Sequence, residues 1–226
     1  MKTKHLLTGL LALTLTFGAD QPVLAGPFLP GEILVNERDG NSVQRYSATG
    51  TLLQTFTGTG TNWSGAALTP GGNLVAAYRT PTNGLDIFSP DGTQLTSFAA
   101  PGAGIASDVS VFPDGTLALG TFSGDSVQFW SQAGVQGITV PLPASTFPFG
   151  STVGSDGILY VAGFGNNTLA RVSAGGVSLG SVSLTFEPGD LVMNPLDGTL
   201  WVSGASNARV EHITTTGRCS AASPRA

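Results

Sequence analysis

The stretch SDGILYVAGFGNNTLARV, residues 155–172, contains a tight turn, a short apolar run, a polar loop and a second short apolar run. Its turn glycine belongs to a series that precedes an apolar run every 41 to 43 residues: Gly31, Gly72, Gly115, Gly157 and Gly198. A second series, in which each glycine ends a polar turn, has the same spacing: Gly50, Gly92, Gly134, Gly176 and Gly217. Two independent series therefore indicate one internal repeat of about 42 residues.

The order of elements within a repeat is clearest between residues 65 and 98. Runs of strand length and composition, separated by Gly, Pro, Asn and Asp, predict four strands, at 65–68, 73–77, 85–89 and 93–98, with a polar loop at 78–84. Four antiparallel strands in each repeat are typical of a β-propeller blade, because one such sheet cannot bury both faces until neighbouring blades stack on it. No 3.6-residue apolar pattern follows Ala25, so we predict an all-β fold with almost no helix.

The number of strands does not match a closed ring. The repeats span about 31–62, 63–104, 105–147, 148–187 and 188–217, and the first and last supply only three strands each. The first blade lacks its inner strand and the last lacks its outer strand, so the sequence predicts an incomplete propeller of about five blades. Residues 218–226, where the outer strand is expected, have the composition of a disordered tail.

Three segments carry a family resemblance. Residues 148–172 resemble the NHL repeat. The same stretch, together with GTLWV at 198–202 and TTTG at 214–217, is similar to streptogramin lyase propellers and the six-bladed, TolB-like (SMP-30/gluconolactonase-like) group. The resemblance covers about residues 31–217 and implies a truncated member of such a family. It also implies a divalent-metal lactonase or lyase, in which a lyase would use a His base with Glu and magnesium. After residue 25 the only histidine is His212, which we place on a third strand away from the channel.

The first 25 residues have the pattern of a signal peptide. Lys2 and Lys4 precede an apolar run from Leu6 to Ala19, and the small-residue pattern at 23–25 suits cleavage after Ala25. The alternative is a short membrane anchor, although the run is shorter than the ~20 residues that span a bilayer. We therefore expect a secreted protein, extracellular or periplasmic, with no membrane span after cleavage.

Charge excludes several classes of function. The chain has a formal net charge of −5, and after residue 25 it keeps 13 acidic side chains against 7 arginines and no lysine. An acidic chain of this kind does not suit nucleic acid. The absence of lysine excludes a Schiff base and a P-loop phosphate clamp. The single cysteine, Cys219, cannot form an internal disulfide.

The loops that join second to third strands, and blade to blade, share one face of a propeller around the channel mouth. We expect ligand-binding side chains there: Glu37, Arg38, Tyr78, Arg79, Asp108, Asp125, Asn166 and Asp190. Asp108 and Asp190 begin inner strands and could together hold Ca²⁺ or Mg²⁺, or could instead accept hydrogen bonds that fix turns. No other cofactor is expected. Five aromatic residues are expected in loops, where they could stack on a ligand or pack between blades: Trp63, Phe122, Phe147, Phe149 and Phe164.

Two functions follow from these residues. A general base within reach of the channel is missing, which favours a non-catalytic propeller that presents its loops to a protein, a glycan or a small ligand. The alternative is a divalent-metal-dependent lactonase or lyase, supported by the resemblance and by Asp108 with Asp190.

Overall fold

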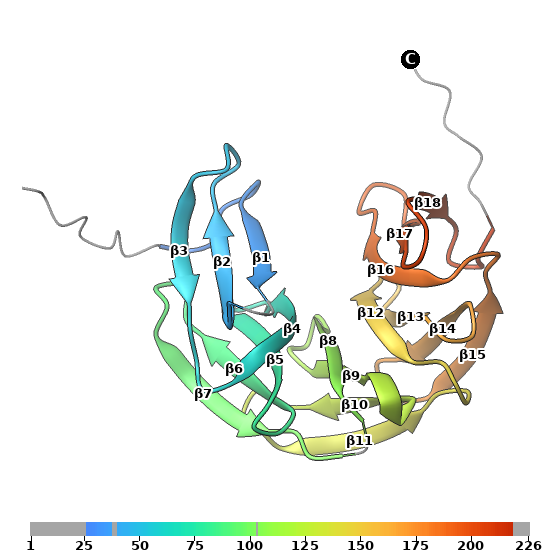
Figure 1. Ribbon diagram of the computed structural model, residues 1–226, viewed down its shortest axis with the longest axis horizontal. Coiled ribbons are helices and arrows are strands. Elements are labelled where there is room, and N and C mark those ends of the chain that lie inside the picture. Colours follow the sequence, from blue (N-terminus) through green and yellow to red (C-terminus); the bar gives the residue numbers. More distant parts are fainter. Residues whose placement is uncertain (1–25, 38–39, 103, 219–226) are drawn as a thin grey trace, which may run out of the picture.

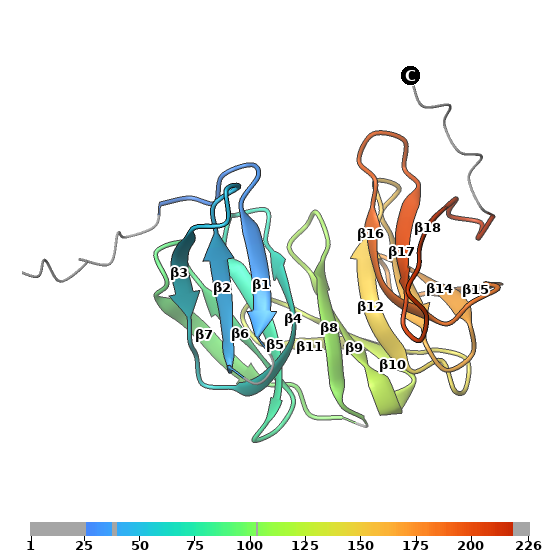
Figure 2. The same cartoon turned by 45° about the horizontal axis from the view of Figure 1, so that its top comes forward.

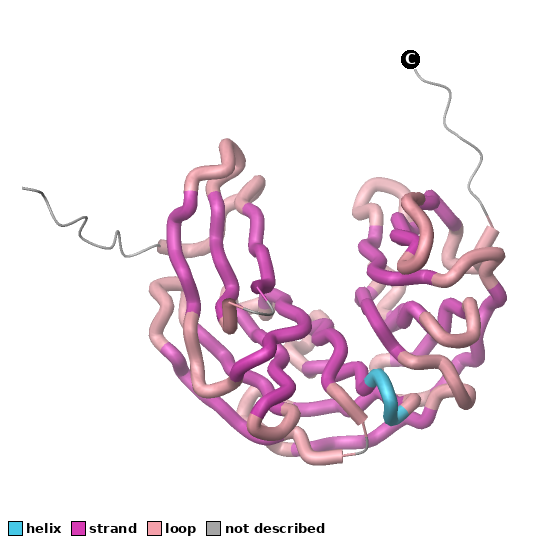
Figure 3. Tube along the Cα trace, in the orientation of Figure 1, coloured by secondary structure: helices cyan, strands magenta, loops and turns pink. Residues whose placement is uncertain are grey.

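The computed structural model describes residues 26–37, 40–102 and 104–218. These residues form five antiparallel sheets placed side by side along an arc, as in a β-propeller (Figure 1). The predicted all-β propeller class is confirmed, since one turn of 3-10 helix at Phe122–Gly124 is the only helix in the described ranges (Figure 3). The predicted signal peptide, Arg38 and the tail from residue 219 lie outside the described residues.

The 18 strands found in the described residues follow the expected distribution of three, four, four, four and three per sheet. The first sheet contains β1 (Ile33–Glu37), β2 (Ser42–Tyr46) and β3 (Leu52–Phe56). The second contains β4 (Thr61–Leu68), β5 (Leu74–Thr80), β6 (Gly84–Phe88) and β7 (Gln94–Ala99). The third contains β8 (Ala106–Val111), β9 (Leu117–Thr121), β10 (Ser126–Trp130) and β11 (Gln136–Pro141).

The two remaining sheets complete the arc. The fourth contains β12 (Pro148–Val153), β13 (Ile158–Gly163), β14 (Thr168–Ser173) and β15 (Ser178–Ser183). The fifth contains β16 (Pro188–Met193), β17 (Leu200–Gly204) and β18 (Val210–Ile213). In both ribbon views β4, β8, β12 and β16 lie on the inside of the arc, and neighbouring members of this set contact each other (Figure 2). These four inner strands therefore line the side of the arc that faces the propeller axis.

The turn glycines explain why the repeat is visible in the sequence. All ten glycines of the two series have φ between +70° and +91°. This left-handed region is open to glycine at little cost but unfavourable for residues with a Cβ atom. Each glycine therefore marks a tight turn that every blade needs.

The hairpin of β4 and β5 is longer than expected. β4 begins at Thr61 rather than at residue 65, and β5 continues to Thr80 through part of the loop predicted at 78–84. Trp63 and Tyr78 are partners across this hairpin, and both belong to the buried cluster that also contains Phe56 and Phe88. Burial of the two rings extends the pairing, because cross-strand aromatic pairs stabilise a sheet.

The first described residues are held to the first sheet by a buried arginine. Arg45 is 2% exposed and forms an ion pair with Glu32, with an N to O distance of 2.7 Å. Its guanidinium also donates to the carbonyl oxygens of Gly26 and Pro27, both at 2.9 Å, and lies 4.4 Å from the ring centre of Phe28. A buried charge needs such partners, so Arg45 fixes residues 26–32 in place.

Candidate functional site

Each inner strand has an irregularity at the same place in its pairing with the second strand. The register shifts between Trp63 and Gly65 in β4, and between Ala106 and Asp108 in β8. Equivalent shifts lie between Pro148 and Ser151 in β12, and between Pro188 and Leu191 in β16. A β-bulge bends its strand and redirects the side chains beside it. The four bulges therefore follow one another along the inside of the arc.

The residues at these bulges alternate between glycine and aspartate. Gly65, Asp108, Gly150 and Asp190 follow one another on β4, β8, β12 and β16. A Cβ atom on Gly65 would lie 2.7 Å from the Cα atom of Asp108, and a Cβ atom on Gly150 would lie 2.7 Å from the Cα atom of Asp190. The two glycines therefore allow the backbone of a neighbouring inner strand, with its aspartate, to approach closely.

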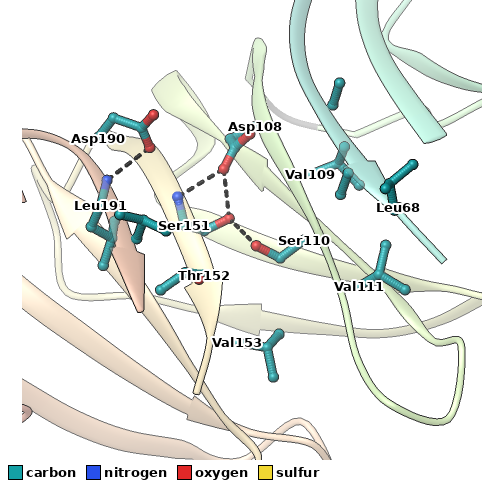
Figure 4. A pocket seen from close by; sticks show the side chains of 13 residues that line it. Leu68, Asp108, Val109, Ser110, Val111, Ser151, Thr152, Val153, Asp190 and Leu191 are labelled. Carbon is teal, nitrogen blue, oxygen red and sulfur yellow. Dashed lines mark hydrogen bonds between the residues drawn. The ribbon is translucent and has the colours of Figure 1, made fainter. Parts of the chain in front are cut away.

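Asp108 is held by hydrogen bonds from the next inner strand. Its Oδ2 accepts the N–H of Ser151 at 2.8 Å and the hydroxyl of Ser151 at 2.9 Å (Figure 4). The Ser151 hydroxyl also lies 2.8 Å from the hydroxyl of Ser110. Asp190 accepts the N–H of Leu191 at 2.8 Å through its Oδ1. Both carboxylates are thus oriented by β12 or β16 backbone groups.

Burial and charge alter the protonation of the pair. Burial raises the pKa of Asp108 to about 7, and the negative charge of Asp190 adds to the increase. Desolvation also raises the pKa of Asp190, although its side chain is more exposed because it lies on the last inner strand of the described residues. The two carboxylates therefore influence each other, and an added positive charge would stabilise both.

Two cavities share this pair of carboxylates. The first, which we call the mouth cavity, has a volume of about 250 Å³. It is lined by Asn36, Trp63, Ser64, Arg79, Ser107, Asp108, Phe149, Gly150 and Asp190. The second, of about 380 Å³, continues along the axis between residues 66–68, 108–111, 151–153 and 190–192. The bulges lie where the two cavities meet.

Two further polar groups belong to the mouth cavity. Ser107 is 6% exposed, and its buried hydroxyl has no hydrogen-bond partner in the described part of the chain. Arg79 donates from Nε to the carbonyl oxygen of Ala106 at 2.7 Å, which fixes its guanidinium on the cavity wall. A buried polar group without a partner is unfavourable, and the Ser107 hydroxyl lies towards Gly120, where an added Cβ atom would be 2.9 Å from it.

Four phenylalanines form a cluster beside the cavity. The ring centre of Phe122 lies 5.3 Å from that of Phe147, 6.1 Å from Phe149 and 5.9 Å from Phe164. Phe149 is 45% exposed and also lines the mouth cavity, so the phenylalanine cluster offers aromatic surface to a ligand. Trp63, expected in a loop, is instead fully buried on β4.

Asp125 positions the loop that carries Phe147. Its two carboxylate oxygens accept the N–H groups of Ser145 at 2.8 Å and Phe147 at 2.7 Å. Ser145 and Phe147 have φ of 61° and 45°, values that cost energy for residues with side chains. The Asp125 carboxylate therefore stabilises a strained loop next to the cavity.

We expect Asp125→Ala to lower the free energy of unfolding by about 2 kcal/mol, because two hydrogen bonds to a charged acceptor are lost and the strain at Ser145 and Phe147 remains. Urea unfolding measures the change. The control is Asp114→Ala, which removes an exposed turn carboxylate that accepts one N–H, from Thr116. Equal effects of the two substitutions would contradict this role for Asp125.

The other predicted site residues have local partners. Glu37 accepts the Ser42 hydroxyl at 3.0 Å, and Asn166 donates to the Thr146 hydroxyl oxygen at 3.1 Å. Tyr78 was expected in the mouth loop, but it lies in the core, where its hydroxyl donates to the Phe98 carbonyl oxygen at 3.3 Å. Of the eight predicted residues, the structure brings Arg79, Asp108 and Asp190 together in one cavity.

His212 lies on β18, where its ring stacks on Trp201 with 4.2 Å between ring centres, and it does not line either cavity.

Within the described ranges, no cluster of three or more His, Cys, Asp or Glu side chains is arranged to hold a metal ion. Nor does that part of the chain contain a helix with the length and apolar character needed to cross a bilayer.

Sequence reasoning missed Ser107, Ser151 and the two bulge glycines. A signal for the glycines was present: Gly65, Asp108 and Gly150 each stand seven residues before a turn glycine of the first series, and Asp190 stands eight before. The roles of the serines depend on contacts between strands, which this spacing does not reveal.

Comparison with known proteins supports the fold. No family model matches the sequence, and no curated protein matches it. Among solved structures, a streptogramin B lyase is similar with a TM-score of 0.72 and 20% sequence identity, over 87% of this chain and 68% of the lyase. A catalytically inactive virginiamycin B lyase from Staphylococcus aureus with quinupristin has a TM-score of 0.66 and 16% identity, over 81% of this chain and 66% of the other.

A functionally unknown protein from Desulfotomaculum acetoxidans is similar to the same degree, with a TM-score of 0.66 and 17% identity, over 84% of this chain and 65% of the other. The chain thus spans about two thirds of the length of these structures. It has a streptogramin lyase-like β-propeller fold.

Proposed function

We propose that this protein is an exported, non-catalytic propeller that binds a small ligand in the mouth cavity. The observation that carries the proposal is the cavity itself, whose wall contains two carboxylates and a fixed guanidinium beside the phenylalanine cluster. Its volume of about 250 Å³ favours a small ligand over a protein or a glycan chain. Export is supported by the sequence pattern of residues 1–25.

The polar groups of the cavity are oriented before any ligand arrives. Ser151 holds Asp108, and the Ala106 carbonyl holds Arg79, so a ligand would not have to order these side chains. Such preorganisation favours binding because less conformational entropy is lost. A ligand that donates to Asp108 and Asp190 would also relieve the repulsion between them.

A thermal-shift screen of small polar molecules tests the proposal. A ligand at 100 times its Kd stabilises a protein by about 2.7 kcal/mol, which corresponds to roughly 5–10 °C for a chain of this size. We expect a ligand to raise the melting temperature of the protein and of an Asp114→Asn control, but not of the Asp108→Asn, Asp190→Asn double variant. The absence of any such ligand, or an equal rise in the double variant, would contradict the proposal.

The second candidate is a divalent-metal-dependent lactonase or lyase. It is favoured by the meeting of Asp108 and Asp190 in one cavity and by the fold shared with a streptogramin B lyase. These carboxylates fit a Ca²⁺ or Mg²⁺ ion only in part, because such an ion would need hydroxyl, carbonyl or water oxygens to complete its shell. A rise in melting temperature on adding either ion, lost in the double variant, together with lactone hydrolysis or elimination, would favour this candidate.

A further inference from the structure

We infer that the ligand is an amphiphilic amine, whose ammonium group lies at Asp108 and Asp190 and whose apolar chain continues along the propeller axis. The chain would occupy the cavity of about 380 Å³ that shares these carboxylates with the mouth cavity and that we call the axial cavity (Figure 4). The inference rests on the proposed binding function, because it uses the same pair of carboxylates, and it names the class of ligand.

The wall of the axial cavity changes from polar to apolar along its length. Asp108 and Asp190 lie at the polar end, where the hydroxyl of Ser151 donates to Asp108 and lies 2.8 Å from the hydroxyl of Ser110. Farther along the strands, each inner strand contributes an apolar side chain to the wall: Leu68 on β4, Val111 on β8, Val153 on β12 and Val192 on β16. A ligand that matches this wall needs a polar head and an apolar chain.

The apolar end of the axial cavity is open to a ligand. Leu68 is 41% exposed and Val192 is 58% exposed. A further cavity of about 450 Å³, which we call the far cavity, shares Leu68, Val111 and Val153 with the axial cavity and is also lined by Met193 and three prolines. Removal of apolar surface from water is favourable, so a chain that covers these side chains would bind more tightly. A metal ion at the carboxylates would leave them uncovered.

The charge of the wall favours an amine over other amphiphiles. Among the described residues, no arginine, lysine or histidine lines the axial cavity or the far cavity, whereas Asp108 and Asp190 supply negative charge. The charge of Asp190 contributes to the raised pKa of Asp108, and an ammonium group beside the pair would offset this repulsion. Asp190 uses its Oδ1 for the N–H of Leu191, and a carboxylate has about four acceptor positions, so it retains capacity for an ammonium donor.

The dimensions of the cavity indicate the length of the chain. Val111 stands three residues after Asp108 on β8, so it lies about 10 Å farther along the strand, because a strand rises about 3.3 Å per residue. A saturated chain of roughly eight carbon atoms, joined in a zigzag by bonds of about 1.5 Å, spans this distance. Octylamine therefore reaches the apolar end from the carboxylates, whereas butylamine does not.

Calorimetric titration with four probes tests the inference: octylamine, butylamine, 1-octanol and octanoate. Butylamine lacks most of the chain, 1-octanol lacks the charge, and octanoate carries the opposite charge. We expect octylamine to bind and butylamine to bind at least about tenfold more weakly, since each fully buried CH₂ group contributes roughly fourfold in affinity. We expect 1-octanol also to bind at least about tenfold more weakly and octanoate not to bind, because neither matches the carboxylates.

A substitution at the apolar end tests where the chain lies. Leu68→Ser should weaken octylamine about threefold or more and leave butylamine unchanged, because the short chain does not reach Leu68. The matched control is Leu95→Ser, since Leu95 is also a partly exposed strand leucine, 52% exposed on β7, but lines neither cavity. Circular dichroism melting verifies that each variant is folded. An equal loss for both amines in the Leu68 variant would overturn the position of the chain.

A substitution at the polar end tests where the ammonium group lies. Asp190→Asn should weaken octylamine about tenfold and leave 1-octanol unchanged, because only the amine interacts with the charge. Asp114→Asn, at an exposed turn, is the control and should bind both probes normally. Unchanged octylamine affinity in the Asp190 variant would overturn the inference.

Failure of the inference can be told from failure of the proposed function. If 1-octanol, octanoate or butylamine binds as tightly as octylamine, or if none of the four probes binds, the amphiphilic amine is wrong. The binding function stands if the thermal-shift screen still finds a ligand whose effect is lost in the Asp108→Asn, Asp190→Asn double variant. If that screen also finds none, both fail.

Discussion

Asp108→Asn should increase the free energy of unfolding at pH 8 and leave it almost unchanged below pH 4. Burial, with the charge of Asp190, raises the pKa of Asp108 from 3.8 to about 7 in the folded protein. Such a change corresponds to roughly 4 kcal/mol of unfavourable free energy once the group is ionised in both states. Asparagine avoids this cost, and its side-chain oxygen can still accept both hydrogen bonds from Ser151.

The sign of the pH dependence follows from proton linkage. Between about pH 4 and 7 the unfolded chain has lost the Asp108 proton while the folded protein still holds it, so stability falls as pH rises through this range. Above about pH 7 the folded protein has also lost the Asp108 proton, so this contribution to stability no longer changes with pH. The variant lacks this contribution, so the difference between the two proteins should grow from pH 4 to 7 and then stay constant.

Urea unfolding of both proteins from pH 4 to 8 measures this difference. Asp114→Asn serves as the matched control, because Asp114 is an exposed turn residue. A variant that is less stable than the natural protein at pH 8, or a difference that does not change with pH, would show that the Asp108 carboxylate is not penalised by its surroundings.

Gly65→Ala and Gly150→Ala should each destabilise the protein by about 3 kcal/mol, the upper end of the usual cost of overpacking. The new Cβ atom would lie 2.7 Å from the Cα atom of Asp108 or of Asp190. Because the obstacle is the backbone of the neighbouring inner strand, no side-chain rotation can relieve the clash, and the two strands must separate.

Gly175→Ala is the control for these substitutions. The nearest atom to its new Cβ would be the Ser173 hydroxyl oxygen at 3.9 Å, and its φ is not positive. We expect its free energy of unfolding to stay within about 0.5 kcal/mol of the natural value. If Gly65→Ala were as stable as Gly175→Ala, the close approach of β4 and β8 would be contradicted.

Both glycine variants also bear on ligand binding. Separation of the inner strands would move Asp108 or Asp190 relative to Arg79. A ligand that raises the melting temperature of the natural protein should therefore bind to these two variants more weakly and raise their melting temperatures less. Gly175→Ala should bind the same ligand normally.

The blade repeat could be predicted from the sequence because its markers are local. A turn glycine such as Gly157 is required by its own positive φ, and short apolar runs between turns indicate strands whatever their neighbours are. The number of strands, their order within each blade and the shortage of helix follow from these markers. The signal peptide and export remain predictions from the first 25 residues.

The candidate site could be predicted only in part. The sequence indicates Asp108 and Asp190 as site residues because it predicts that they begin inner strands, and both line the same two cavities in the structure. The sequence places Tyr78 in a polar loop at 78–84, but Tyr78 is the strand partner of Trp63 across the hairpin and is buried. Whether such an aromatic residue is buried or exposed depends on a partner in another strand.

Local conformational preference is therefore sufficient to define where the blades of this protein turn and how many strands each contains. The bulges, the glycine and aspartate pairs between inner strands, the phenylalanine cluster and the mouth cavity came from packing between blades. Asp108 and Ser151 are 43 residues apart, and no short-range pattern specifies that one will accept hydrogen bonds from the other. Such contacts depend on how closely neighbouring sheets approach around the axis, which is a property of the assembled fold.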